Sequence, residues 1–182
     1  MVYSTIRYEV QDDVAVITLN RPEVMNALNT QMRAEILHAV REAPGEARVL
    51  VMTGEGRAFC SGQDLGDRAS GAALDLERTL RDEYEPMLMA IYECPIPTIA
   101  AVNGAAAGAG ANLALAADVV IAAEGASFIQ AFSRIGLIPD AGGTYWLPRQ
   151  VGFSKAMGAA LFAEKISARQ ASDWGMIWEA VP

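Results

Sequence analysis

The chain has 182 residues, of which 52% are apolar and 20% are charged, a composition typical of a packed globular domain and not of a disordered chain. Its net charge of −8 comes without a basic cluster, which argues against nucleic acid as a partner. One histidine and two cysteines exclude a multi-histidine metal site and a disulfide framework, so no metal ligands are expected.

The N-terminal part predicts two strands and an amphipathic helix. Residues 3–10 and 14–20 flank a polar turn and predict paired strands. Residues 30–43 predict a helix, because apolar side chains recur there every four residues and Asn29 is suited to cap its start. No signal peptide is evident, so a cytoplasmic location is expected. The apolar stretch 96–123 is interrupted by glycines and polar residues, which predicts core and no membrane span.

The middle of the chain joins a strand, a glycine-rich loop and a helix. Residues 48–53 predict a strand buried on both faces, and a glycine-rich loop follows at 54–65. Small polar residues at 66–71 predict a mobile segment, and residues 75–93 predict a long helix. Small residues in such a loop allow a ligand to approach the main chain closely.

The second half repeats this order of elements. A buried strand is predicted at Thr98–Val102, a second small-residue loop at 103–110 and a helix at 109–116. A third buried strand is predicted at 118–123, and a third glycine-rich turn at 136–144. Further helices are predicted at 144–151, 154–162 and 168–174. Strands that alternate with helices indicate an α/β architecture.

Two of the small-residue loops are candidates for a binding cradle. Each follows a buried strand and precedes a helix, and the first N–H groups of a helix have no intrahelical partner. Two such loops that face one point can stabilise the negative charge of an enolate or a tetrahedral intermediate. The alternative is that small residues only allow tight packing of strand and helix, and composition alone leaves both interpretations open.

Four segments carry motifs that together are specific. They read N-R-P-E-V-M-N-A-L at 20–28, A-F-C-S-G-Q-D-L at 58–65, V-N-G-A-A-A-G-A-G at 102–110 and G-L-I-P-D-A-G-G-T at 136–144. In this order they resemble the N-R-P-x-x-x-N-A-L, A-F-x-x-G-x-D-[LI], V-N-G-x-x-x-G-x-G and G-x-x-P-x-x-G-G-T segments of the enoyl-CoA hydratase/isomerase (crotonase) family. Any one of them alone is a weak signal, whereas four in order across nearly the whole chain are a specific one.

The resemblance implies a fold, a substrate class and an assembly. The implied fold is the α/β crotonase-like (ClpP/crotonase) fold, with repeated β-β-α units in a spiral and C-terminal helices. Residues 1–182 then form a single crotonase-like domain that lacks the family's C-terminal helical region, because family members continue beyond Pro182. The implied substrate is an acyl-CoA thioester, with coenzyme A as part of the substrate and no permanently bound cofactor. A homo-oligomer, either a trimer or a dimer of trimers, is implied as well.

The resemblance also implies site residues by motif position. In the family the two loops form an oxyanion hole for the thioester carbonyl, which assigns the backbone N–H groups of Gln63 and Ala109 to this role. Ala109 stands where the family usually has glycine, and it keeps the donor if its φ suits alanine. The implied contacts to the substrate or its coenzyme A are Ala58, Gln63, Asp64, Leu65, Gly108, Asn112 and Phe132. For Asp64 the alternative is a carboxylate that caps its own loop.

The acid/base residues favour isomerisation over the addition of water. Hydratases of the family place a water with two glutamates, and the matching positions here are Asn112 and Phe132, neither of which exchanges protons. Asp140 stands where certain isomerases of the family carry an acidic residue, and one carboxylate beside an enolate cradle suffices to remove and return a proton. The alternative for Asp140 is a helix N-cap.

One branch of the family matches more closely than the others. Residues 61–68, 131–149 and 174–178 resemble the ring-1,2-epoxyphenylacetyl-CoA isomerases. The resemblance implies rearrangement of such an aryl epoxide or a double-bond shift in an unsaturated acyl-CoA. An enoyl-CoA hydratase with unusual acid/base residues and a non-catalytic acyl-CoA-binding homologue remain the alternatives.

Overall fold

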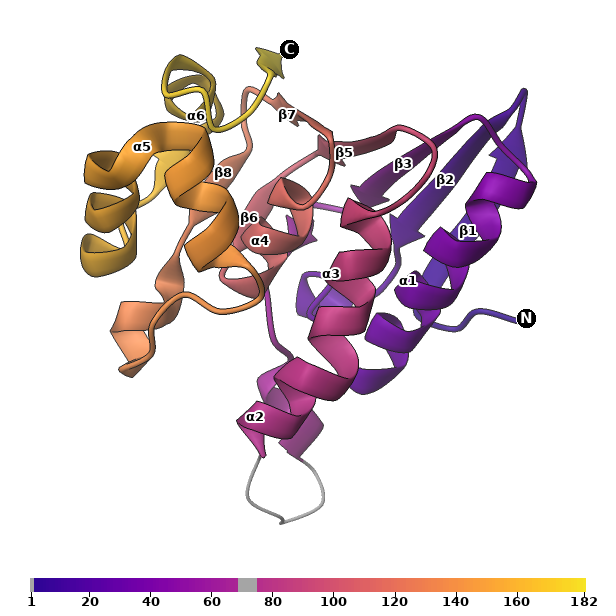
Figure 1. Ribbon diagram of the computed structural model, residues 1–182, viewed down its shortest axis with the longest axis horizontal. Coiled ribbons are helices and arrows are strands. Elements are labelled where there is room, and N and C mark those ends of the chain that lie inside the picture. Colours follow the sequence, from indigo (N-terminus) through magenta and orange to yellow (C-terminus); the bar gives the residue numbers. More distant parts are fainter. Residues whose placement is uncertain (1, 69–74) are drawn as a thin grey trace.

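The computed structural model describes residues 2–68 and 75–182, and in this part of the chain two sheets form the framework. The larger sheet has the strand order β1-β2-β3-β5-β7-β10, and the smaller sheet has the order β4-β6-β8-β9. The strands are β1 Ile6–Gln11, β2 Val14–Leu19, β3 Val49–Gly54, β4 Ala58–Cys60, β5 Thr98–Val102, β6 Ala105–Ala107, β7 Val119–Ala123, β8 Ser127–Ile129, β9 Ile166–Ser167 and β10 Glu179–Val181. Figure 1 shows α1 and α3 side by side over the β1–β3 end of the larger sheet, and α5 and α6 at the other end.

The helices follow the strands in a repeated order. They are α1 Thr30–Glu42, α2 Leu76–Thr79, α3 Glu85–Tyr92, α4 Ala109–Leu115, α5 Gly143–Phe162 and α6 Ala168–Asp173, with a π turn η4 at Leu80–Tyr84 and 3-10 turns η1 Pro22–Val24, η2 Ala43–Gly45, η3 Leu65–Arg68 and η5 Ala131–Ile135. A strand of the larger sheet, a short strand of the smaller sheet and a helix recur as β3-β4-α3, β5-β6-α4 and β7-β8-α5. This order confirms the expected β-β-α repeat.

The smaller sheet is the part that the sequence did not predict. The glycine-rich loops expected at 54–65 and 103–110 contain β4 and β6, which pair in parallel. Each of these strands has only three residues, which is too short for an alternating apolar pattern to be recognised in the sequence. Pairing between the units, and not the local sequence, determines these strands.

The predicted helices are confirmed, with changes at their interruptions. Asn29 caps α1, since its side-chain oxygen accepts a hydrogen bond from the Met32 N–H at 2.8 Å. The long helix expected at 75–93 is divided by the π turn, and α5 joins the two helices expected near Gly152, whose φ of 76° bends the chain. None of the helices within the described ranges is long and apolar enough to cross a bilayer.

Strand β3 differs from its prediction in burial. Leu50 and Met52 are fully buried, whereas Val49 and Val51 remain partly exposed, so the expectation of a strand buried on both faces is wrong. The alternation shows that the core packs against one face of the larger sheet. The predicted mobile segment 66–71 falls partly on η3 and partly outside the described residues.

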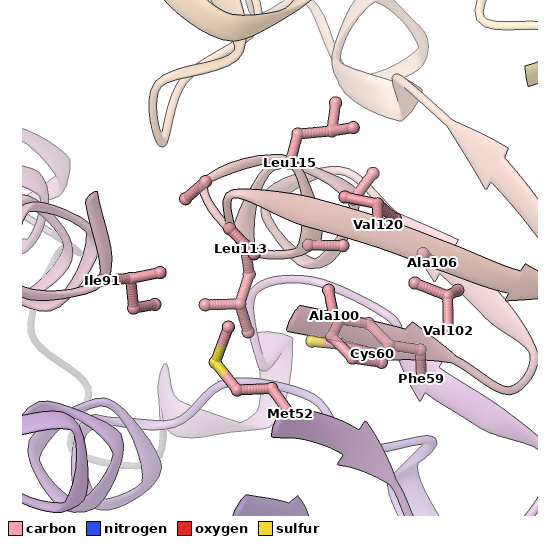
Figure 2. Close-up of a cluster of buried hydrophobic side chains, with 14 of the residues drawn as sticks. Met52, Phe59, Cys60, Ile91, Ala100, Val102, Ala106, Leu113, Leu115 and Val120 are labelled. Atoms are coloured by element: carbon pink, nitrogen blue, oxygen red, sulfur yellow. The ribbon is translucent and has the colours of Figure 1, made fainter. Parts of the chain in front are cut away.

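The core lies where the two sheets and α4 meet. Figure 2 shows Leu113 of α4 in the middle of a cluster that includes Met52 of β3 and Ile91 of α3. Phe59 and Cys60 of β4 belong to the same cluster and are completely buried. Truncation of such a buried leucine to alanine costs about 2–5 kcal/mol, so α4 is fixed firmly between the sheets.

Candidate active site

The two small-residue loops lie against each other beyond the parallel strands β4 and β6. A Cβ atom on Gly62 would stand 2.8 Å from the Ala107 carbonyl oxygen and 3.4 Å from the Ala109 nitrogen. Gly62 also has a φ of +96°, which side chains other than glycine rarely adopt. The loop after β4 can therefore reach the start of α4 only with glycine at this position.

The main chain of Gln63 is oriented by a bridge to Leu28. The Leu28 N–H donates to the Gly62 carbonyl at 2.8 Å, and the Asp64 N–H donates to the Leu28 carbonyl at 3.1 Å. In a parallel bridge of this kind the residue between the two bonded neighbours turns its own N–H to the opposite side. The Gln63 N–H therefore points away from Leu28.

Ala109 is the first residue of α4 and keeps a negative φ, so alanine fits there without strain. The N–H of Asn112 donates to the Gly108 carbonyl at 3.2 Å, which places the N–H of Ala109 ahead of this helical bond. Gly108 itself has a φ of 52° and donates its N–H to Ile129 at 2.8 Å. The loop after β6 is thereby tied to β8.

A buried clamp holds the side chain of Gln63. Its Oε1 accepts hydrogen bonds from the Tyr84 hydroxyl at 2.6 Å and from the Arg33 guanidinium at 3.0 Å. Arg33 is only 2% exposed and pairs with Glu83 at 2.6 Å. The bonded partners lie 21, 30 and 50 positions apart along the chain. Sequence reasoning therefore missed Arg33 and Tyr84, and no local pattern indicates them.

Asp64 caps its own loop. One carboxylate oxygen accepts from Arg21 at 2.7 Å, and the other accepts from the Gly66 N–H at 2.8 Å. The structure therefore supports the loop-capping alternative for Asp64 over a free carboxylate. Leu65, the next residue, is 61% exposed and lies at the surface.

Two motif asparagines have structural roles. Asn26 is fully buried, and its side-chain N–H group donates to the carbonyl of Ala58 at 2.9 Å. Asn103 accepts a hydrogen bond from the Gly54 N–H at 3.1 Å and donates to the Gly56 carbonyl at 3.0 Å. Ala58 is itself buried, so its side chain does not reach the surface.

Asp140 lines a cavity of about 620 Å³ between the α2–α3 helix and the start of α5. Aromatic rings make up much of its wall, and they belong to Tyr84, Tyr92, Tyr145 and Trp146. The charged side chains along its wall are Glu77, Arg81 and Glu85. Burial raises the pKa of the Asp140 carboxyl to about 6, against a smaller opposing effect of its own backbone N–H.

The turn that carries Asp140 rests on α4. The side-chain N–H of Asn112 donates to the Asp140 carbonyl oxygen at 2.8 Å, and the Gly143 N–H donates to the same oxygen at 2.8 Å. The N-cap residue of α5 is Gly142, and α5 has no side-chain cap. The N-cap interpretation of Asp140 is therefore wrong, and its carboxyl group does not bond the start of α5.

Phe132 lies over the second loop. It is 6% exposed, and its ring carbon Cζ would be 3.7 Å from a Cβ atom on Gly108. An aromatic ring therefore occupies the side of the loop at which the resemblance expects the second hydratase glutamate.

Within residues 2–68 and 75–182 no three His, Cys, Asp or Glu side chains are grouped to hold a metal ion.

The site residues thus fall into two connected groups. Gln63 and Ala109 belong to the contact between the two loops, and Asp140 is linked to the first turn of α4 through Asn112. Tyr84 connects the groups, because it bonds Gln63 and also lines the cavity of Asp140. Of the site residues predicted from the sequence, Asp140 alone lines this cavity. The others do not belong to its lining, and they are Ala58, Gln63, Asp64, Leu65, Gly108, Ala109, Asn112 and Phe132.

Known proteins share both the sequence and the fold. The sequence profile of the Enoyl-CoA hydratase/isomerase family matches residues 9–182. A Rhodobacter capsulatus protein named "Probable enoyl-CoA hydratase" is 70% identical over the whole chain, which spans 70% of that relative. The 1,2-epoxyphenylacetyl-CoA isomerase of Escherichia coli is 48% identical over 94% of the chain and 68% of its own length.

Solved structures agree with this relationship. The crystal structure of an enoyl-CoA hydratase from Bacillus anthracis superposes with a TM-score of 0.92 at 34% identity, over 98% of this chain and 70% of that one. The chain therefore matches about 70% of the length of its relatives, and their fold along that length. The match of profile, sequence and fold shows that the chain belongs to the enoyl-CoA hydratase/isomerase family.

Proposed function

We propose that this chain carries the site of an acyl-CoA isomerase, in which Asp140 is the only acid/base residue. The main-chain N–H groups of Gln63 and Ala109 hold the thioester oxygen, and the carboxylate of Asp140 moves one proton. The observation that carries the proposal is the Asp140 carboxyl, which lines a largely apolar cavity and has its pKa raised to about 6 by burial. A base with a pKa near the working pH is well suited to proton transfer.

The proposed reaction balances with this single carboxylate. In a 3-enoyl-CoA, Asp140 takes a proton from C2, and the electron pair moves into a dienolate whose oxygen is stabilised by the two N–H groups. The same proton returns to C4, so the double bond shifts to C2–C3 and no atom is gained or lost. The rearrangement of a ring epoxide to an oxepin breaks the carbon–carbon bond that the epoxide shares with the ring and relocates one proton, so no atom is gained or lost and it is an isomerisation as well.

The side chains around the proposed site favour isomerisation over the addition of water. Asn112 is completely buried and bonded to Asp140 and Gln130, so it is not available to place a water. Phe132 presents an apolar ring beside Gly108. Since neither side chain can exchange a proton, one carboxylate remains for the chemistry.

The cavity beside Asp140 supports an acyl group that contains a ring. Its walls include the rings of Tyr84, Tyr92 and Trp146, and aromatic rings pack favourably against each other. The relative from Escherichia coli is named for an acyl-CoA with an epoxidised aromatic ring. We therefore propose 1,2-epoxyphenylacetyl-CoA and 3-enoyl-CoA thioesters as the first substrates to test.

We also propose the setting of the reaction. Coenzyme A enters and leaves with the acyl group, and no permanently bound cofactor is required. The active form is a homo-oligomer, a trimer or a dimer of trimers, and it works in the cytoplasm.

The substitution Asp140→Asn tests the proposed base. Wild-type protein should convert trans-3-hexenoyl-CoA into the conjugated 2-enoyl thioester, followed by its absorbance, or rearrange the epoxide. Asp140→Asn keeps the size of the side chain and should lower kcat by about 10² to 10⁴-fold with little change in KM. Asp173→Asn, an exposed aspartate on α6, serves as the matched control and should leave kcat unchanged. Equal turnover by Asp140→Asn and the wild type would exclude Asp140 as the base.

A hydratase is the second candidate, because the Rhodobacter capsulatus relative is named as one. Incubation with crotonyl-CoA separates the two functions. A hydratase removes the conjugated absorbance by adding water, whereas the proposed isomerase leaves it nearly constant. Rapid loss of this absorbance would favour the hydratase and would require an acid and a base other than Asn112 and Phe132.

A further inference from the structure

Asn112 lies buried near the proposed base, and its side-chain amide is hydrogen-bonded on both sides. Asn112 and Gln130 are 0% and 1% exposed, and three segments of the chain meet at the Asn112 amide. Its Nδ2 donates to the Asp140 carbonyl oxygen at 2.8 Å, and its Oδ1 accepts from the Gln130 Nε2 at 2.8 Å. The amide is therefore bonded on both sides inside the protein.

The Asp140 carbonyl determines which way the Asn112 amide faces, and the Gln130 amide matches that orientation. The Asp140 carbonyl is an acceptor only, so a hydrogen bond to it requires the N–H side of the amide. A rotated amide would set its oxygen against the Asp140 carbonyl oxygen, and its N–H group against the N–H group of Gln130. The pair of bonds therefore fixes one orientation of the Asn112 amide.

The turn at Asp140 depends on contacts of this kind. Ala141 and Gly142 follow with φ values of 47° and 80°, and a left-handed alanine costs about 1 kcal/mol or more. A Cβ atom on Gly143 would lie 2.5 Å from the Asn112 Nδ2, so only glycine lets the turn approach this close. The hydrogen bond from the Asn112 amide therefore holds the turn against α4, since the backbone conformation of the turn is not one that its own residues favour.

We infer that Asn112 is a positioning residue for Asp140: its amide, which is also bonded to Gln130, fixes the main chain from which the Asp140 carboxylate reaches the substrate. This inference rests on the proposed function of Asp140. Asn112 stands at the position of a hydratase glutamate, and in this inference it positions Asp140, the carboxylate that carries out the chemistry. Because a displacement of about 1 Å at a reacting group can cost about 10²-fold in rate, loss of this bond should appear in kcat.

The first variant removes the hydrogen bond and nearly preserves the shape. Asn112→Leu has no donor, so we expect kcat to fall by roughly 10 to 10²-fold while KM changes less than about twofold. The matched control is Gln150→Leu, because the Gln150 side chain donates to the Leu115 carbonyl at 3.4 Å near the opposite end of α4. The control should lose a similar amount of stability in urea and keep the wild-type kcat.

The second variant supplies a signature that a merely structural role lacks. In Asn112→Asp the new carboxyl group takes the place of a completely buried amide, so burial should raise its pKa. The neutral carboxylic acid can donate one hydrogen bond and accept another, as the amide does. At low pH the kcat of this variant should equal that of the wild type, and at high pH it should fall to the kcat of Asn112→Leu. The pH profile of kcat therefore gains a falling limb that the wild type does not have. The other titratable groups at this cavity are the same in both proteins and affect both profiles equally; they are Glu77, Arg81, Tyr84, Glu85, Tyr92, Asp140 and Tyr145.

The variants are measured together with Asp140→Asn on the same acyl-CoA, and with circular dichroism to confirm folding. If Asp140→Asn is inactive while folded Asn112→Leu keeps the wild-type kcat, the positioning role is wrong and the proposed function stands. The inference is also overturned if the pH profile of Asn112→Asp has no falling limb. It is overturned as well if Gln150→Leu loses as much kcat as Asn112→Leu. If Asn112→Leu does not fold, the pH profile of Asn112→Asp decides. Full activity of Asp140→Asn would instead reject the proposed function.

Discussion

Among single residues, Asp140 has the properties that its proposed role requires. Its carboxyl lines a largely apolar cavity, while its main-chain carbonyl accepts two hydrogen bonds from α4 and from its own turn. The motif around it indicated this residue from the sequence. The partners of the site were not predictable, because Arg33, Tyr84 and Gln63 meet through side chains that are far apart along the chain.

The raised pKa of Asp140 predicts the pH dependence of the reaction. A base accepts a proton only when it is ionised, and burial raises the pKa of this carboxyl to about 6. We therefore expect kcat/KM for 3-enoyl-CoA isomerisation to rise across pH 6 and to level off above about pH 7. Initial rates in overlapping buffers measure this profile. A profile that rises near pH 4, where an ordinary aspartate titrates, would contradict the shifted pKa.

Among the elements, α4 and the short strands of the smaller sheet set the geometry of the site. The strands β1, β2, β3, β5 and β7 of the larger sheet were predicted from the sequence, whereas β10 was not. Helix α1 was predicted from its four-residue spacing and its cap. The strands β4, β6 and β8 were not predicted, because three residues are too few to show a periodicity. The contact that places α4 between the sheets is therefore a product of tertiary packing.

The substitution Gly110→Ala tests how closely α4 approaches β4. A Cβ atom at position 110 would stand 2.3 Å from the Cys60 carbonyl oxygen, and neither backbone can move freely in the core. We expect a loss of about 1–3 kcal/mol in the free energy of unfolding, measured in urea. Gly45→Ala is the matched control, because a Cβ atom there meets nothing within 4 Å. Equal stability of the two variants would contradict the close contact.

For the molecule as a whole, the order of strands follows from the stacking of β-β-α units. No single segment of the sequence encodes that β3 pairs with β5, or that β7 lies between β5 and β10. The spiral arrangement was available only through the resemblance to a family. The N-terminal hairpin is tied to this stack by Glu35, which accepts hydrogen bonds from Ser4 and Thr5.

Glu35 predicts how the stability of the whole molecule depends on acid. Burial raises its pKa, but hydrogen bonds from Thr5, Gln31 and Ser4 outweigh this effect and lower the pKa to about 2. The folded pKa is below the unfolded value of about 4.3, so the stabilisation is complete above that pH and is lost as the pH falls through about 2. The sign follows because the unfolded chain binds the proton more readily.

The substitution Glu35→Gln should therefore lower the free energy of unfolding by about 2 kcal/mol at neutral pH, and by much less at pH 2. Urea unfolding at several pH values measures the difference. Glu42→Gln, an exposed glutamate at the end of the same helix, is the control and should change little at either pH. A pH-independent difference between the Glu35 variant and the wild type would rule out this linkage.

The contact between Gly62 and Ala109 has an evolutionary consequence. The groups proposed to hold the thioester are the main-chain N–H groups of Gln63 and Ala109, and a substitution other than proline at either of these two positions changes the side chain but keeps the donor. In the proposed function, selectivity for the acyl group depends instead on replaceable rings along the cavity wall, such as those of Tyr92 and Trp146. Substitutions of residues that line the cavity can therefore change the acyl group that is accepted, while the main-chain N–H groups proposed to stabilise the enolate are kept.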